Sequence, residues 1–258
     1  MSAVREPSMG GRRVSLRAVT FDFWNTLIAA DGEPALEVRA AAWSEELATL
    51  GTPRSVAEIL AAFDAGWRRY DERWAANEQT DVVRFTREAL EDLRVQPTGP
   101  LVAALAECYI AAAVALEHPL LPGVAAALGA LTDAGIAVGI VCDVGMTPSQ
   151  YLRGYLDRAN VLDAFDHWSF SDEVGVYKPH RDIFAHALTG LGVQDPTQAV
   201  HVGDLRRTDI AGARAFGMTA IRYAGAFDDP PGEPVVEGHA VIAHHDELVD
   251  ALYQGRTS

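Results

Sequence analysis

The chain has 258 residues, 49% of them hydrophobic, which is enough for one large domain or for one domain with a smaller insertion. Its formal net charge of −15 argues against DNA or RNA as a partner, because nucleic-acid-binding proteins usually present a basic surface. No apolar run reaches about 18 residues, and two cysteines in a chain of this size indicate a reducing compartment without a disulfide framework. We therefore expect a cytoplasmic protein with no membrane partner.

Residues 1–16 carry charges but no apolar region of the kind found in a secretion signal, and we predict a flexible N-terminal tail there. The stretch LRAVTFDFW, which begins at Leu16, is apolar and rich in β-branched and aromatic residues. Such a composition predicts a buried strand. Asp22 stands at the end of this strand, and Thr26 and Leu27 close the turn that follows.

Residues 32–117 carry four helical patterns and no strand pattern. The second pattern begins at Ser55, with Glu58 three residues later, which is the spacing of a capping box. We predict that residues 32–117 form an inserted helical domain with the tryptophans of its helices in its core. The helices are expected over Pro34–Leu50, from Ser55 to about Tyr70, near Val82–Leu93 and near Pro100–Leu116, and the tryptophans are Trp43, Trp67 and Trp74.

From Leu120 onward, short apolar strands alternate with helical patterns, which predicts a parallel sheet with crossover helices. The expected fold class is α/β, with a Rossmann-like three-layer core built by residues 17–31 and 118–258 and interrupted by the four-helix insertion. The expected strands are Ile136–Cys142, Trp168–Ser171, Ala199–Val202, Thr219–Tyr223 and Ala240–Ala243. The expected helices include Tyr151–Arg158, Arg181–Leu191 and Thr208–Phe216.

Residues whose side chains could take part in catalysis or bind a metal follow successive strands of the predicted sheet. Each has an ordinary interpretation, since an aspartate after a strand is often a helix cap and a lysine before proline is often a solvated loop residue. Functional groups of open α/β sheets nevertheless gather at the carboxyl ends of strands, so their recurrence there predicts one shared site. The residues are Asp22, the pair Cys142-Asp143, Lys178, the pair Gly203-Asp204, and Asp209.

This set suits phosphoryl transfer through a carboxylate. Such a reaction needs a nucleophile, a divalent cation and donors around the phosphoryl oxygens. Asp22 is the candidate nucleophile, and with Asp204 and Asp209 it could hold Mg²⁺, which prefers oxygen ligands. Lys178 could neutralise both Asp22 and the phosphate, and Thr26 could donate to a phosphoryl oxygen.

The motifs resemble those of the haloacid dehalogenase superfamily, whose members are mostly phosphatases. FDFWNTL is similar to its first motif, GIVCDVG stands at the place of the second, GVYKPHRDIF is similar to the third, and VHVGDLRRTDIAGARAFGM to the fourth. The resemblance implies an aspartyl-phosphate on Asp22, catalytic help from Lys178 and Thr26, and a phosphate site formed by Thr26, Cys142, Asp143 and Lys178. It also implies a C1-type cap for the helical insertion. The implied Mg²⁺ ligands are Asp22, Asp204, Asp209 and the backbone carbonyl of Trp24.

Three residues depart from the family pattern. Trp24 replaces the aspartate that acts as general acid and base in the phosphatases, a contribution of roughly 10²–10⁴ in rate. We therefore expect a slow enzyme or one that prefers good leaving groups, such as aryl or acyl phosphates. Asn25 replaces a glycine and is expected to tolerate positive φ. Cys142 replaces a serine or threonine, and a thiol is the weaker donor to phosphate.

Two other functions remain open from the residues. The bulky aromatic side chain of Trp24 is similar to the tyrosine that 2-haloacid dehalogenases carry there, although Phe184 stands where those enzymes have another tyrosine. The changes at Trp24 and Cys142 are also compatible with a binding or regulatory protein that has lost turnover. The favoured prediction is a Mg²⁺-dependent phosphatase of a small phosphorylated metabolite, as a monomer or a homodimer.

Overall fold

The structure is a computed structural model that describes residues 15–30, 32–232 and 235–254. The predicted flexible tail over residues 1–16 therefore lies almost entirely outside the described residues. Across the described ranges, no helix combines the length and the apolar character that crossing a membrane requires.

The described residues contain a single parallel sheet of six strands in the order β3-β2-β1-β4-β5-β6. The first strand occupies the centre, with Phe21 opposite Ile140 on one side and Val202 on the other. The five strands expected after residue 118 are confirmed, with ends that differ by at most one residue. The strands are β1 (Ala18–Phe21), β2 (Ala137–Cys142), β3 (His167–Phe170), β4 (Ala199–Gly203), β5 (Thr219–Tyr223) and β6 (Ala240–Ile242).

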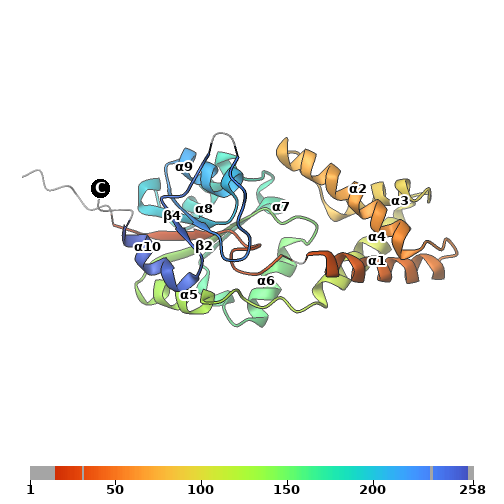
Figure 1. The fold of residues 1–258 in the computed structure, drawn as a ribbon, viewed down its shortest axis with the longest axis horizontal. Coiled ribbons are helices and arrows are strands. Elements are labelled where there is room, and N and C mark those ends of the chain that lie inside the picture. The colour runs from red at the N-terminus through yellow and green to blue at the C-terminus, as the bar shows by residue number, and fades with distance from the viewer. Residues whose placement is uncertain (1–14, 31, 233–234, 255–258) are drawn as a thin grey trace, which may run out of the picture.

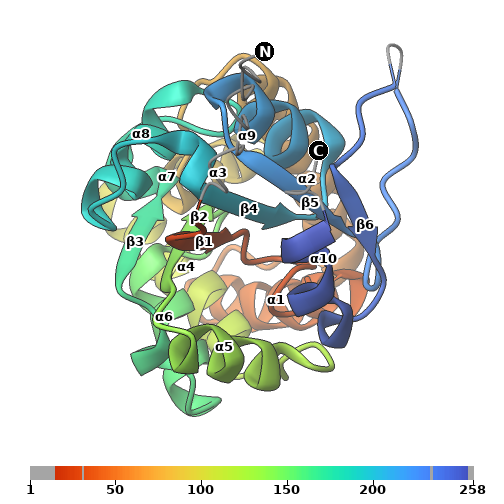
Figure 2. The same ribbon diagram turned by 90° about the vertical axis from the view of Figure 1, so that its left-hand side faces the viewer.

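Helices cover both faces of the sheet, which gives the expected three layers (Figure 2). Successive side chains of a strand point to opposite faces, so Val19 and Phe21 pack on one layer and Ala18 on the other. The first layer contains α5 (Val124–Asp133), α6 (Ser149–Arg158) and α10 (Leu248–Gln254), and the second contains α8 (Arg181–Gly190) and α9 (Ala211–Phe216). The helix α10 and the single turn α7 (Ser171–Val174) were not among the predicted elements.

Four of the five helices that the structure describes between β1 and β2 form a second body beside the sheet, here named the helical block (Figure 1). Their core is aromatic: the ring of Trp43 meets Phe63 edge-on at 4.9 Å, and Phe63 meets Tyr109 at 5.2 Å. The capping box of Ser55 and Glu58 is present as predicted. The block consists of α1 (Gly32–Thr49), α2 (Val56–Ala75), α3 (Val82–Asp92) and α4 (Gly99–Val114).

The segment between α2 and α3 connects the helical block to the loop that precedes α8. The Asn77 side chain donates to the Tyr177 carbonyl at 2.9 Å and accepts from the Tyr177 amide at 3.0 Å. The Tyr177 hydroxyl accepts from the Thr80 amide at 3.1 Å. Because Tyr177 immediately precedes Lys178, these bonds set the block directly over the carboxyl edge of the sheet.

Candidate active site

Asp22 is held at the end of β1 by a backbone bond from its own amide to the Val202 carbonyl, 2.8 Å long. The chain then turns sharply at Asn25, whose φ is +54°, so the expected left-handed conformation is confirmed. The Asn25 side chain also accepts a hydrogen bond from the Ala30 amide at 3.0 Å, which gives asparagine a function that glycine could not perform. This turn presents the Asp22 carboxylate at the centre of the sheet edge.

Asp204 directly follows β4, and Asp209 lies in the π-helical turn that comes next, η3 (Arg206–Ile210). The Ile210 amide donates to the Leu205 carbonyl five residues earlier, at 3.2 Å, and the Leu205 amide donates back to Asp209 Oδ2 at 3.0 Å. Turns of this type insert one extra residue and often occur at functional sites. A Cβ on Gly203 would lie 2.4 Å from Asp209 Cγ, so this position requires glycine.

Lys178 joins the carboxylates. Its Nζ lies 2.5 Å from Asp22 Oδ1 and 2.7 Å from Asp209 Oδ1, and its side chain is 3% exposed. Asp22, Asp204 and Asp209 each contribute one oxygen to a group in which all atoms lie within 4.8 Å of one another. Segments that follow β1, β3 and β4, far apart in the sequence, therefore bring together the four residues predicted to form the centre of the site.

The charges of this cluster do not balance. Burial raises the pKa of Asp204 to about 9, and repulsion from Asp22 and Asp209 adds to the increase. Burial also raises the pKa of Asp22 to about 7, although Lys178 opposes it. For Asp209 burial acts in the same direction, but Lys178 and His201 outweigh it and hold the pKa well below its usual range. One ammonium thus compensates three carboxylates only in part.

A divalent cation fits this donor set. Three carboxylate oxygens within 4.8 Å of one another can surround a single cation, and oxygens are the hard ligands that Mg²⁺ prefers. The raised pKa values of Asp22 and Asp204 show that their ionised forms lack compensating positive charge. A bound cation would supply that charge and favour the ionised carboxylates. The backbone carbonyl of Trp24 stays a predicted ligand.

His201 is part of the cluster and was missed in the sequence. It is fully buried, with Nε2 3.0 Å from Asp209 Oδ1 and Nδ1 2.9 Å from Thr20 Oγ1. Burial lowers the pKa of His201, although Asp209 opposes this. The contact between the ring and Asp209 Oδ1 also fixes the orientation of that carboxylate. A signal was available: His201 is the one strongly polar side chain in the strand AVHVG, whose residues are otherwise apolar or glycine.

The other predicted phosphate-site residues differ in their surroundings. Thr26 Oγ1 is buried and has no hydrogen-bond partner among the described residues. Cys142 is fully buried in the layer of α5 and α6, and burial raises the pKa of its thiol. Asp143 Oδ1 accepts from the Lys178 amide at 2.9 Å, and its Oδ2 accepts from Trp74 Nε1 at 2.7 Å.

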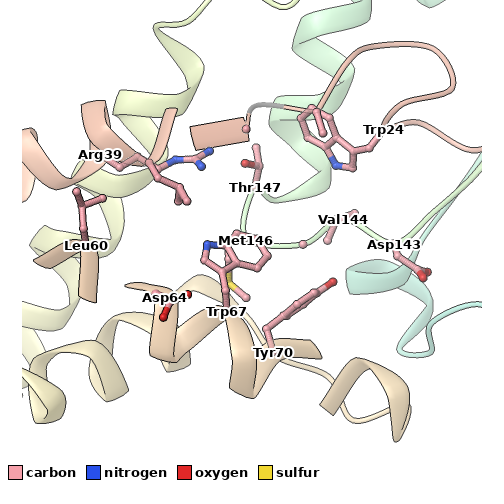
Figure 3. Close-up of a pocket in the computed structure, with 14 residues that line it drawn as sticks. Trp24, Arg39, Leu60, Asp64, Trp67, Tyr70, Asp143, Val144, Met146 and Thr147 are labelled. Carbon is pink, nitrogen blue, oxygen red and sulfur yellow. The ribbon is translucent and has the colours of Figure 1, made fainter. Parts of the chain in front are cut away.

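Two adjoining cavities open between the helical block and the sheet edge. The smaller, about 240 Å³, contains Asp22, Lys178, Asp204 and Asp209. The larger, about 450 Å³, lies toward the block (Figure 3). Neither is lined by Thr26 or Cys142. The residues that line both cavities are Trp24, Tyr70 and Asp143.

The tryptophans of the helical block occupy different environments. Trp43 is fully buried in the core of the block, as predicted. Trp67 and Trp74 both pack against that core, as predicted, and each also lines a cavity, Trp67 the larger one and Trp74 the smaller one. Helical spacing identified the inward side of α2 but not the part of that side that faces the sheet edge.

The chain is similar in sequence or fold to several known hydrolases. Residues 16–217 match the family model of haloacid dehalogenase-like hydrolases. A glyceraldehyde 3-phosphate phosphatase of Methanopyrus kandleri is 35% identical over 54% of this chain, which spans only 58% of that relative. A phosphoglycolate phosphatase of Salmonella choleraesuis is 25% identical over 92% of this chain and 93% of its own. A 2-haloacid dehalogenase of Pseudomonas syringae shares the fold, with a TM-score of 0.67, 23% identity, and coverage of 92% of this chain and 98% of its own.

Proposed function

The chain belongs to the haloacid dehalogenase-like hydrolase family, and from this membership we propose that it is a Mg²⁺-dependent phosphatase of a small phosphorylated metabolite. The observation that carries the proposal is the cluster of Asp22, Asp204 and Asp209 around the Lys178 ammonium. The phosphatase relatives support the same reaction class.

Asp22 is the proposed nucleophile. One carboxylate oxygen attacks phosphorus, the bond from phosphorus to the leaving oxygen breaks, and the phosphoryl group is carried as an aspartyl-phosphate. Water then attacks phosphorus and releases inorganic phosphate and the Asp22 carboxylate. Lys178 neutralises the charge that collects on Asp22 and the phosphoryl oxygens. The Thr26 hydroxyl is fully buried and lines neither cavity, so no contact with the phosphoryl group is assigned to it.

Asp22, Asp204, Asp209 and the carbonyl of Trp24 would hold the metal. Bound Mg²⁺ would supply charge that reduces repulsion between the anionic nucleophile and the anionic substrate. His201 and Lys178 would keep Asp209 ionised and oriented for this task. Within the described part of the chain, Lys178 forms ion pairs with Asp22 and Asp209 but not with Asp204, so Asp204 is the carboxylate that gains most from the cation.

Trp24 limits which substrates can react. Its indole cannot protonate a leaving oxygen at neutral pH, so the enzyme depends on leaving groups that are stable as anions. Aryl and acyl phosphates meet this condition, whereas alkyl phosphates do not. We therefore propose slow turnover of alkyl phosphates.

Dehalogenation is the second candidate, favoured by the aromatic side chain of Trp24 beside the nucleophile. The two activities differ in their metal requirement, so the test uses purified protein with Mg²⁺ or with EDTA. The phosphatase proposal expects release of phosphate from 4-nitrophenyl phosphate that needs Mg²⁺ and disappears in Asp22→Asn. Chloride release from 2-chloropropionate in EDTA would establish dehalogenation instead. If the protein shows neither activity, the binding protein is the function that remains.

A further inference from the structure

The larger cavity lies directly beside the cluster of acids. It is about 450 Å³ in volume, within the range of about 300–1,000 Å³ typical of small-molecule sites. Trp24, Tyr70 and Asp143 line both cavities, so a molecule whose phosphoryl group sits next to Asp22 has its remaining part at the entrance of the larger one. Figure 3 shows Asp143 at one end of this cavity and Leu60 at the other.

The walls of this cavity are largely aromatic and aliphatic. Trp24 and Trp67 contribute indole rings, and Leu36, Leu60 and Met146 add aliphatic surface. The aromatic side chains are fixed by their own packing: Trp67 meets Tyr70 edge-on at 5.2 Å, and Trp24 meets Phe23 at 5.0 Å. Preformed aromatic walls favour a flat, apolar guest, because binding then costs little ordering of side chains.

The chemistry of Trp24 leads to the same class of guest by a separate argument. Without a general acid, the leaving oxygen must depart with the electron pair of the broken bond as an anion. A phenolate is far more stable than an alkoxide, since the ring delocalises its charge. Trp24, which stands in place of the general acid, therefore also lines the cavity that would receive an aromatic ring.

We propose that the natural substrates are aryl phosphate monoesters whose aromatic ring occupies the cavity lined by Trp24, Leu60 and Trp67. This inference rests on the phosphatase function proposed above. Asp22 forms the new bond to phosphorus, the aryl oxygen leaves with the electron pair, and solvent protonates the phenolate. Water then displaces the Asp22 carboxylate from phosphorus, and its proton passes to solvent.

Binding of non-hydrolysable phosphonates tests the cavity independently of turnover. Benzylphosphonate and methylphosphonate carry the same head group and differ by a phenyl ring. With Mg²⁺ present, calorimetry should give a Kd for benzylphosphonate at least about tenfold lower, as expected for full burial of one aromatic ring. Equal Kd values for the two phosphonates would overturn the inference.

Leu60→Trp adds an indole to the far end of the cavity and should abolish most of this preference for the phenyl ring. Val56→Trp is the matched control, because Val56 lies one turn earlier on α2, is 37% exposed and does not line the cavity. It should keep the full preference. An unchanged preference in Leu60→Trp, with thermal unfolding showing a folded protein, would overturn the inference.

Turnover separates this inference from the function on which it rests. The wild type should hydrolyse phenyl phosphate with a higher kcat/KM than acetyl phosphate, although both leaving groups are good. Hydrolysis of acetyl phosphate without preference for either the phenyl substrate or benzylphosphonate would overturn the aryl inference alone. Preferential binding of benzylphosphonate without hydrolysis of any phosphate ester would instead overturn the phosphatase function.

Discussion

Lys178 Nζ lies 2.7 Å from Asp209 Oδ1, and both side chains are almost completely buried. Removing one partner of such a pair leaves an uncompensated buried charge, which costs about 3–5 kcal/mol. Lys178→Met should therefore lower the free energy of unfolding by about that amount, measured by urea denaturation, and should abolish activity. Arg68→Met is the control: it breaks the exposed pair with Asp64 and should cost less than about 1 kcal/mol. Equal losses in the two variants would contradict the assignment of Lys178 to a buried cluster.

Trp24→Asp should restore a general acid. Hydrolysis of alkyl phosphates should then accelerate by up to roughly 10²–10⁴, while that of aryl phosphates should change much less. The measurement is kcat/KM for a matched pair, phenyl phosphate and glycerol phosphate, in the presence of Mg²⁺. Trp24→Phe removes the indole without supplying an acid and should leave the ratio between the two substrates low. No acceleration in Trp24→Asp would show that the missing acid does not limit the enzyme.

Gly203→Ala should displace Asp209, because the new Cβ would lie 2.4 Å from Asp209 Cγ. We expect a loss of about 1–3 kcal/mol in stability from this overpacking, and a fall in kcat because Asp209 loses its position. Gly129→Ala is the matched control, since nothing lies within 4 Å of a Cβ at this position of α5. It should stabilise the protein by about 0.5–1 kcal/mol, as alanine is the better helix former. Wild-type kinetics in Gly203→Ala would contradict the role of Asp209.

The stability of the metal-free protein should fall as pH rises from 7 to 9. In the folded protein Asp204 keeps its proton up to a pKa of about 9, because burial and then Asp22 raise that pKa, whereas the unfolded chain releases the proton near 3.8. The folded state therefore binds more protons in this window, and its stability decreases as they are lost. We expect a loss of about 1–2 kcal/mol between these pH values in EDTA, measured by urea unfolding.

Mg²⁺ should remove this slope, because the cation binds ionised carboxylates. Asp204→Asn should also flatten the profile in EDTA, since the titrating group is gone. Below about pH 6.5 the two buried histidines oppose this slope: burial lowers the pKa values of His201 and His245, so the unfolded chain takes up their protons first, and this weakens the gain in stability that the raised pKa values of Asp22 and Asp204 give on acidification. A profile in EDTA that is flat or rises from pH 7 to 9 would contradict the raised pKa of Asp204.

Much of the sheet could be predicted because its strands are short apolar runs bounded by polar residues. Strand β5 was predicted to the residue, and the centre of the site followed from the rule that functional groups gather at carboxyl ends. Helix α10 was missed because it is a short element that follows an irregular segment, and its apolar residues Leu248 and Leu252 acquire meaning only once β1 and α5 are there to pack against.

The finer features of the site depend on the direction in which each side chain points, which a sequence pattern does not specify. Position 142 on β2 determines that the Cys142 side chain enters the α5 and α6 layer, and this alternation is fixed only when the register with β1 is known. The π-helical turn that orients Asp209 has no characteristic amino-acid pattern by which it could be predicted. The role of Trp74 required the approach of α2 to Asp143, a contact between residues 69 positions apart.

The central place of β1 affects how the protein is made. The first strand leaves the ribosome early, yet Thr20 meets His201 across 181 positions of chain. At about 5–20 residues per second, translation keeps β1 without its second neighbour for roughly 10–40 s. During that time the nascent chain holds an apolar strand with an open edge, and the helical block has already been synthesised. Asp22 and the proposed metal ligands Asp204 and Asp209 therefore come together only late in synthesis, so a prematurely terminated chain carries Asp22 without the acids that would act with it.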